Sequence, residues 1–527
     1  MTTRFVSTIT PCAFALMLVA ASSAWGCGAK RTPPEDSTAS GDDAKGADEG
    51  DDERGESPDE LDGKVTDASS RRRDASMPDA TARNAEGGAE RELDSGMPGP
   101  SSDPPADAGP PAPFEGEGEP WKAPAPRATC GAGDKADGTI SGLSEELRCN
   151  IEPVAQVPAP HFLSLAWYRD CAYVNGADGT TVIRVAPDGT PTVTTTLTTV
   201  GFRSNWESMK ANPESGLLAG YESNGTTLTV YDLKGDCAKP ELQGSISLSG
   251  ALGGTIGHAG NFSPDGTIYY ASSMYTTEII AVDLANPKMP TVITKTFERG
   301  AHDLFVAKGG TRGYFAVPDL LNKGLGVGSF SVMDLSQVQA RAPNAKGTLI
   351  SELSWEDGNI SQYPILLSYR GKDFLMINDE LGSGACGNSE KPQWGYARIF
   401  DLSDEKSPKL VSLIKTEAHE PTNCQAAGMA EGSTGGFGVS THYCNVDRLE
   451  EPRLLSCGIQ AGGVRVYDIR NPWRPKEVAY FSTTDGAVPG MQRIHVEKRE
   501  LWLATQPGTF YVMKFPAGGL VDQILSN

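Results

Sequence analysis

The sequence predicts an all-β fold: a seven-bladed β-propeller preceded by a signal peptide and a long disordered acidic linker. One short phrase recurs five times, in which an alternating apolar strand ends at an Asp and a turn leads into a second apolar strand. The Asp residues of the five copies are Asp232, Asp283, Asp334, Asp401 and Asp468, and the steps from one to the next are 51, 51, 67 and 67 positions. A β-unit of this length cannot bury its own faces, so several units must pack together.

A second recurring strand, rich in Tyr, Leu and small residues, sets the number of units at seven. Its copies lie at 171–177, 217–223, 269–275, 313–319, 374–380, 454–460 and 501–507. Seven such units suggest a propeller, which leaves only short, protected strand edges. The chain ends soon after the third strand of the last unit, so residues 149–158 are expected to supply the fourth and close the ring. Six or eight blades are near alternatives, and a β-sandwich pair or a β-solenoid is a more distant one.

The Asp of the repeated phrase is expected to form a turn rather than to bind a ligand. An Asp at a strand end can accept a hydrogen bond from the backbone N–H two residues later. Pro290, Pro408 and Pro475 follow seven residues after their Asp, where an outer strand tolerates a missing donor. The same turn chemistry explains Asp188 and Asp265 in two Pro-Asp-Gly sequences.

Residues 1–26 are expected to be a signal peptide. Arg4 supplies the positive charge, and residues 13–21 form an apolar stretch too short to span a bilayer. The Ala-Trp-Gly-Cys sequence that ends at Cys27 is similar to a bacterial lipobox, which would make Cys27 the lipidated first residue of a membrane-anchored envelope protein. The alternative is cleavage near Ala24 and a secreted protein, with Cys27 a plain thiol.

Residues 27–127 are expected to form a disordered acidic tether rich in Pro and Gly, which leaves residues 128–527 for the propeller. Residues 28–127 hold 25 Asp and Glu against 12 Lys and Arg, a net charge of −13, and their only aromatic residues are Phe114 and Trp121. Such a segment cannot bury enough apolar surface to offset its chain entropy. The net charge of −22 for the whole chain argues against nucleic acid as a partner.

Eight cysteines remain once Cys12 leaves with the signal and Cys27 is set aside as the anchor. An even number of cysteines in an exported protein suggests disulfides, and none of them lies in a Cys-x-x-Cys pair that would favour zinc or redox chemistry. Placing them on the predicted blades puts four pairs on one face and in one blade or in adjacent blades: Cys130 with Cys149, Cys171 with Cys237, Cys386 with Cys424, and Cys444 with Cys457. The alternative is eight reduced, buried thiols.

Residues 466–481, V-Y-D-I-R-N-P-W-R-P-K-E-V-A-Y-F, carry a resemblance to a known family. Together with residues 441–465, they look like the LVIVD-repeat propellers, which are exported bacterial proteins mostly without assigned chemistry. The similarity is strong over 440–481, fair over 260–290 and 395–410, and weak elsewhere. The resemblance implies the propeller fold and an envelope location, and it supplies no catalytic residues.

Aligning the seven inner strands places one polar residue of each at the mouth of the axial channel, on the face that we call the top. They are His161, Glu207, His258, His302 with adjacent Asp303, Gln362, His442 and Gln492. His and carboxylate around a channel could bind a divalent metal or serve as acid and base. The ring could also take an organic or peptide ligand, or simply bond neighbouring blades and hold channel water. His419 and His495 fall outside it, as a loop residue and an inner-strand packing residue.

The expected function is a non-catalytic binding or interaction module, held at the membrane by its lipid anchor. Its ligand on the top face is an unidentified protein or small molecule, and a divalent metal is the one cofactor that the ring suggests. The sequence contains no Gly-x-Ser-x-Gly, no His-Glu-x-x-His and no phosphate-binding glycine loop. The alternative function is a metal-dependent propeller hydrolase or lactonase that assembles its site across blades from the His/Glu ring.

Overall fold

The computed structural model describes most of the chain after residue 111. The described residues are 112–135, 146–160, 164–223, 225–249, 257–273, 278–317, 327–358, 360–380, 395–420, 423, 440–459, 463–482, 490–506 and 508–526. The expected signal peptide, the lipidation candidate Cys27 and most of the expected tether lie outside these residues. The propeller belongs to the compact unit Pro110–Asn527.

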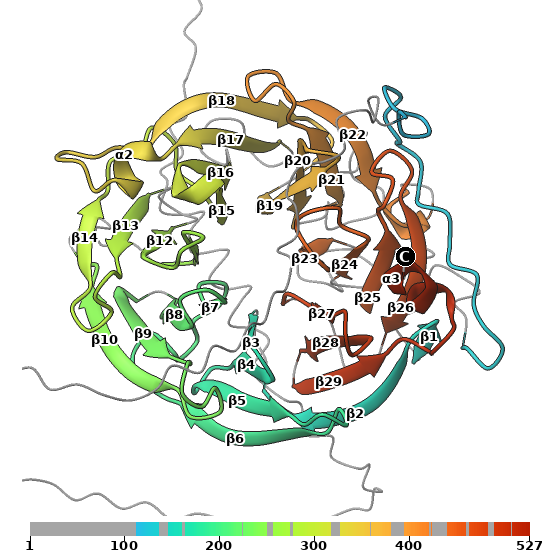
Figure 1. Ribbon diagram of the computed structural model, residues 1–527, viewed down its shortest axis with the longest axis horizontal. Helices are drawn as coiled ribbons and strands as arrows, with labels where there is room; N and C mark the ends of the chain where they lie inside the picture. Colours follow the sequence, from blue (N-terminus) through green and yellow to red (C-terminus); the bar gives the residue numbers. More distant parts are fainter. Residues whose placement is uncertain are drawn as a thin grey trace, which may run out of the picture. The chain divides into compact units, whose positions relative to one another are not determined.

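Seven antiparallel sheets arranged around a central axis form the propeller, as the sequence predicts (Figure 1). In each blade the first strand lies nearest the axis, and inner strands of neighbouring blades contact one another. Blade one consists of β3 (Leu165–Tyr168), β4 (Cys171–Asn175), β5 (Thr180–Val185) and β6 (Pro191–Leu197). Blade two consists of β7 (Lys210–Asn212), β8 (Leu217–Tyr221), β9 (Thr227–Asp232) and β10 (Glu241–Ser247). Blade three consists of β11 (Ala259–Phe262), β12 (Ile268–Ser272), β13 (Ile279–Asp283) and β14 (Thr291–Thr294).

The next two blades follow the same order from the axis outwards. Blade four consists of β15 (Leu304–Ala307), β16 (Arg312–Ala316), β17 (Gly328–Asp334) and β18 (Thr348–Trp355). Blade five consists of β19 (Ser361–Tyr369), β20 (Lys372–Asp379), β21 (Ala397–Asp401) and β22 (Lys409–Ile414). The described helical segments are short: η1 (Lys308–Gly310), α2 (Ser336–Gln339), η2 (Glu417–His419) and α3 (Leu520–Ser526). None of the described helices has the length and hydrophobicity that a bilayer-spanning segment needs.

The last two blades each take a strand from the beginning of the domain. Blade six consists of β23 (Thr441–Val446), β24 (Leu454–Ile459), β25 (Gly463–Asp468) and β26 (Lys476–Ser482), with β1 (Leu147–Cys149) paired outside β26. Blade seven consists of β27 (Arg493–His495), β28 (Glu500–Thr505), β29 (Thr509–Lys514) and β2 (Glu152–Pro158). The antiparallel pairing of β2 with β29 closes the ring, which confirms the predicted closure for residues 152–158 of the expected 149–158. Cys149 belongs instead to β1, on blade six.

The repeated phrase marks the end of the third strand in blades two to six. In all five copies the Asp accepts a hydrogen bond from the N–H two residues later, at 2.7 to 3.1 Å from nitrogen to oxygen. Pro290, Pro408 and Pro475 stand directly before the outer strands of their blades. These Asp residues therefore form turns, as predicted.

The hydrophobic core lies between neighbouring blades. Between blades two and three, for example, Tyr221 and Val230 pack in one buried cluster with Tyr269 and Val282. Because each β-sheet buries its faces only against the next blade, the positions of the inner strands depend on a complete ring.

Residues 112–127, which we call the strap, lie on blades five and six. Trp121 exchanges main-chain hydrogen bonds with Val411 and Leu413 of the outer strand β22. The Phe114 ring lies edge-on to Tyr369, with centroids 6.0 Å apart, and the Arg370 guanidinium covers it at 3.6 Å. The expected end of the tether at 127 is therefore too late, since its two aromatic residues supply enough apolar contact to fix the strap.

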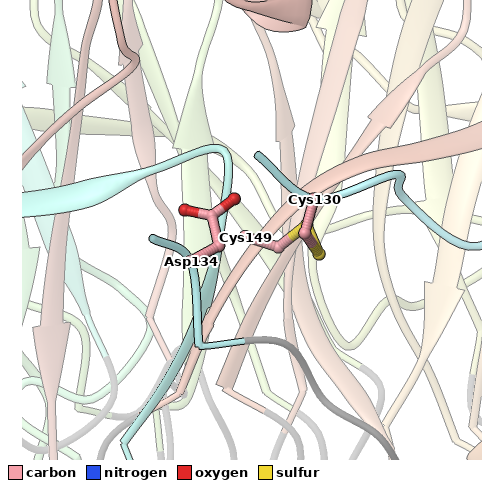
Figure 2. A group of neighbouring side chains, drawn as sticks. All are labelled: Cys130, Asp134 and Cys149. Carbon is pink, nitrogen blue, oxygen red and sulfur yellow. A yellow bond between two sulfur atoms is a disulfide. The ribbon is translucent and has the colours of Figure 1, made fainter. Parts of the chain in front are cut away.

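Three of the four predicted disulfides are present in the described residues. Cα–Cα separations are 5.0 Å for Cys130–Cys149, 5.9 Å for Cys171–Cys237 and 4.1 Å for Cys444–Cys457. Figure 2 shows the first of them, beside Asp134. Cys386 and Cys424 lie outside the described residues, so their pairing stays a prediction. Disulfides are typical of proteins that fold outside the reducing cytoplasm.

His419, expected to be a loop residue, is a buried part of the turn η2 after β22. Its Nδ1 accepts a hydrogen bond from the Thr416 N–H at 3.0 Å, and its ring lies edge-on to Tyr396. Burial, aided by the positive charge of Lys415, lowers the pKa of His419 to about 3. The imidazole is therefore neutral in the folded protein at any mildly acidic pH.

The strap should stabilise the propeller. Replacing both Phe114 and Trp121 by Ala should lower the free energy of unfolding by about 2–4 kcal/mol, because partly buried aromatic surface becomes exposed. Urea denaturation of the full chain measures this, with Met289→Ala as the control because that side chain is 69% exposed. An unchanged midpoint in the double variant would mean that the strap only rests on the surface.

The buried His419 should make stability depend on pH. Its folded-state pKa lies below the unfolded value of about 6.5, so stability is fully present above pH 6.5 and is lost as the pH falls towards 3. At pH 5 the loss should be about 2 kcal/mol. Urea denaturation at pH 7.5 and pH 5 measures this loss as the difference between the two free energies of unfolding. The variant His419→Asn, which keeps an acceptor for Thr416, should show a correspondingly smaller difference than the wild type. An equal difference in both proteins would contradict this assignment.

Candidate functional site: a buried His/Glu cluster at the axis

Polar side chains from the inner strands gather at the axis of the propeller. Each lies at or just before the beginning of an inner strand, which is the position that the sequence alignment predicted. All of them are buried: Glu207 before β7, His258 before β11, His302 and Asp303 before β15, Gln362 in β19, His442 in β23 and Gln492 before β27. His161 lies outside the described residues.

Glu207 is the centre of this cluster. Its Oε2 lies 3.4 Å from Nε2 of His258 and 3.4 Å from Nε2 of His302, while its Oε1 lies 3.1 Å from Nε2 of His442. Blade two thus presents one carboxylate to imidazoles from blades three, four and six. The side chain of Glu207 is only 1% exposed, so these groups replace water around its charge.

Glu380 completes the cluster from blade five, and the sequence analysis did not select it. Its Oε2 lies 3.0 Å from Nε2 of His442 and its Oε1 lies 3.9 Å from Nε2 of His302. Glu380 follows β20, whose last residue, Asp379, pairs with Ser361 at the beginning of β19. The end of a second strand therefore reaches the same edge of the blade as the beginning of the first. The Asp-Glu that ends 374–380 was the signal that could have revealed it.

The His302 ring is oriented by a main-chain carbonyl. Nδ1 lies 3.3 Å from the carbonyl oxygen of Ser361, which can only accept, so the proton is on Nδ1. Nε2 therefore turns a lone pair towards Glu207, and it makes no hydrogen bond with the described residues although the side chain is fully buried. His258 stacks on His302, with ring centroids 4.7 Å apart.

The side-chain amide nitrogen of Gln362 points towards the cluster. The Asn378 amide nitrogen donates to the carbonyl oxygens of Thr441 and His442 and also to Oε1 of Gln362. Nε2 of Gln362 is thereby directed to Oε1 of Glu207 and to Nε2 of His442, at 3.0 Å from each. Gln362 is therefore a donor to Glu207, and its predicted role in ligand binding stays a prediction.

A second layer of charged and polar groups supports Glu207. The Tyr443 hydroxyl lies 3.3 Å from Oε2 of Glu207 and 2.9 Å from Oδ2 of Asp303. Nζ of Lys210 lies 3.1 Å from the same Asp303 oxygen and donates to the Glu207 carbonyl oxygen at 2.7 Å. Lys210 also lies over the rings of Tyr363 and Tyr443. This buried ion pair fixes the backbone that carries Glu207.

The charges of these buried groups are strongly coupled. Burial opposes ionisation of Glu207 most strongly, yet His258 and the other imidazoles hold its pKa well below the usual range. Burial also disfavours protonated His442, but hydrogen bonds to Glu207 and Glu380 raise its pKa to about 10. Burial lowers the pKa of His302. Burial raises the pKa of Asp303 to about 6 in spite of the charge of Lys210.

Gln492, which was predicted to join the ring, and His495, which was predicted to lie outside it, both lie apart from the cluster. Gln492 is buried at the beginning of blade seven, but its amide donates to the main-chain carbonyl of Tyr443 at 3.4 Å. His495 packs on Trp502 within blade seven, with ring centroids 6.1 Å apart, as expected of an inner-strand packing residue.

The cluster presents five side chains that could hold a metal ion. Ligating atoms of Glu207, His258 and His302 lie within 4.8 Å of one another, and so do those of Glu207, Glu380 and His442. Two further groups among the described residues combine an Asp with Cys130 and Cys149 or with Cys171 and Cys237. Their sulfur atoms are joined in disulfides, as Figure 2 shows for Cys130 and Cys149, which leaves the axial cluster as the candidate site.

Comparisons with known proteins found matches among solved structures alone. No family model matches the chain, and no curated protein matches it. Among solved structures, the Cps50 (Swd1) β-propeller domain of Myceliophteria thermophila aligns with a TM-score of 0.46 at 11% identity, over 69% of this chain and 100% of that domain.

Two further solved structures align at similar levels. A hypothetical selenium-binding protein from Sulfolobus tokodaii has a TM-score of 0.47 at 15% identity, over 66% of this chain and 83% of the other. A protein from Lactobacillus plantarum has a TM-score of 0.43 at 11% identity, over 62% and 86%. Identities of 11% and 15% assign no function to this chain.

Proposed function

We propose that the protein is an exported β-propeller that binds a divalent transition metal at its axis and acts as a non-catalytic binding module. The observation that carries this proposal is the convergence of three imidazoles and two carboxylates from five consecutive blades. All five side chains are at most 7% exposed. Buried charges of this kind are normally paired with one another or coordinated to a metal.

The ligand types favour a first-row transition metal. Imidazole nitrogen suits Zn, Cu, Fe and Ni, whereas Ca²⁺ and Mg²⁺ prefer sites built only from oxygen. Among the residues that the structure describes, the cluster offers no thiolate, which argues against a soft metal. Three His and two Glu provide at least the four ligands that a closed zinc site requires.

The surroundings of the cluster support metal binding over a simple polar network. Metal-bound histidines usually donate their other ring N–H to a carbonyl or carboxylate, and His302 does so to Ser361. Ligating carboxylates are in turn hydrogen-bonded, as Glu207 is by Gln362 and Tyr443. The His302 Nε2 makes no hydrogen bond with the described residues, so its lone pair is available to coordinate a metal ion.

Burial of the cluster favours the non-catalytic function over the hydrolase that the sequence left open. A metal enclosed by five blades fits a role in holding the propeller together and shaping a binding face. A metal-dependent hydrolase or lactonase is the second candidate, because a divalent ion bound by His and Glu can activate water. Catalysis would in addition require substrate to reach side chains that are almost fully covered.

The cellular location and the family suggested by the sequence are part of this proposal. An LVIVD-like propeller, exported and lipidated at Cys27, would display its binding face in the cell envelope. The three disulfides support folding outside the cytoplasm. The partner would be a protein or small molecule of the envelope.

Metal binding can be tested on the exported full chain. Elemental analysis after dialysis should find a divalent transition metal in the wild type and less than a tenth as much in Glu207→Ala. At a free metal concentration 1,000 times the Kd, binding should stabilise the wild type by about 4 kcal/mol, and EDTA should remove this gain.

Gln492→Ala is the matched control for that test, because Gln492 is equally buried at an inner strand but does not face the cluster. It should retain metal at the wild-type level. A wild type that holds no metal, and whose melting temperature neither EDTA nor added Zn²⁺, Mn²⁺, Fe²⁺, Ni²⁺ or Cu²⁺ changes, would contradict the proposal.

Lipidation predicts that Cys27→Ser releases the protein from the membrane fraction in soluble form, because the acyl chains would have no attachment site. Fractionation and intact mass measure this. A variant that stays with the membrane, or a mature wild type that begins near Trp25 without acyl mass, would rule out the anchor.

A further inference from the structure

We infer that the axial site binds two divalent metal ions bridged by Glu207. This inference rests on the proposed function, because it concerns the number of ions in the same site. Its starting point is that the ligating atoms form two groups of three that share only Glu207. One group adds His258 and His302, and the other adds Glu380 and His442.

The two oxygens of Glu207 serve different groups. Oε2 lies 3.4 Å from Nε2 of both His258 and His302, and Oε1 lies 3.1 Å from Nε2 of His442. A carboxylate that gives one oxygen to each of two ligand groups is arranged as a bridge. A single ion would instead be met by one oxygen of Glu207, or chelated by both, with all the imidazoles on the same side.

Glu380 repeats this arrangement. Its Oε1 is directed to His302 at 3.9 Å, and its Oε2 is directed to His442 at 3.0 Å. Both carboxylates therefore present one oxygen to the His302 side and one to the His442 side. Two ions about 3.5–4 Å apart, the usual spacing of two-metal sites, would then have four protein ligands on the His302 side and three on the His442 side.

Hydrogen bonds from two blades keep Glu207 in the bridging orientation. Nε2 of Gln362 donates to Oε1 at 3.0 Å, and the Tyr443 hydroxyl lies 3.3 Å from Oε2. Rotation of the carboxylate towards a single ion would break both contacts. Two divalent ions carry four positive charges against two glutamates, so a small anion such as hydroxide would complete the site.

The test is the metal stoichiometry of the full chain in native mass spectrometry after loading with Mn²⁺ or Zn²⁺. The wild type and the Gln492→Ala control should bind two ions. His258→Ala and His442→Ala should each bind one, because each removes a ligand of one group, and Glu207→Ala should bind fewer than one. In the Mn²⁺ form, electron paramagnetic resonance should show an exchange-coupled pair in the wild type and the six-line signal of an isolated ion in His442→Ala.

The outcomes separate this inference from the proposed function. One ion in the wild type, with an isolated Mn²⁺ signal, would overturn the two-metal inference and leave the proposed metal site in place. No bound metal in the wild type would overturn both. The wild-type result decides the matter even where a variant fails to fold, which circular dichroism would reveal.

Discussion

The pairing of β2 with β29 is the interaction on which the rest of the structure depends. It joins residues 152–158 to the last strand of the chain, and so holds the seventh blade between the sixth and the first. A propeller blade buries its faces only against its neighbours, so an open ring would leave two faces exposed and would let the inner strands separate. The axial cluster takes its geometry from this closure, because its three imidazoles and two glutamates come from five different blades.

Closure of the ring buries several charged and titratable side chains at the centre of the propeller. Glu207, Glu380 and Asp303 lie there together with three imidazoles and Lys210, all shielded from water. Burying an ion pair costs much of what the attraction returns, and removing one partner leaves a costly unpaired charge. Lys210 and Asp303 form such a pair, with Nζ and Oδ2 3.1 Å apart, whereas the two glutamates and three histidines are the groups that the proposed metal would neutralise. The same groups thus explain both why the site would bind metal and why it would stabilise the ring.

The architecture could be predicted from the sequence because the repeat is marked by an Asp that forms the same turn in each copy. Five Asp residues form the same turn at the same blade position. Aligning each inner strand to the Tyr- and Leu-rich strand that follows it placed Glu207, His258, His302 and His442 at equivalent points. Glu380 was missed because it belongs to a second strand and reaches the axis only through the pairing of β19 with β20. The strap was missed because an acidic, Pro-rich composition predicts disorder, although two aromatic contacts suffice to fix it.

The most direct test of metal binding at the axis is X-ray diffraction from crystals of the exported, purified protein. Data are recorded on both sides of the absorption edge of the metal found in it. The account predicts anomalous density between the carboxylates of Glu207 and Glu380 and the Nε2 atoms of His258, His302 and His442. Density for water alone at this position, in a protein supplied with transition metals during expression, would contradict it. The axial cluster would then be a polar network that only bonds neighbouring blades.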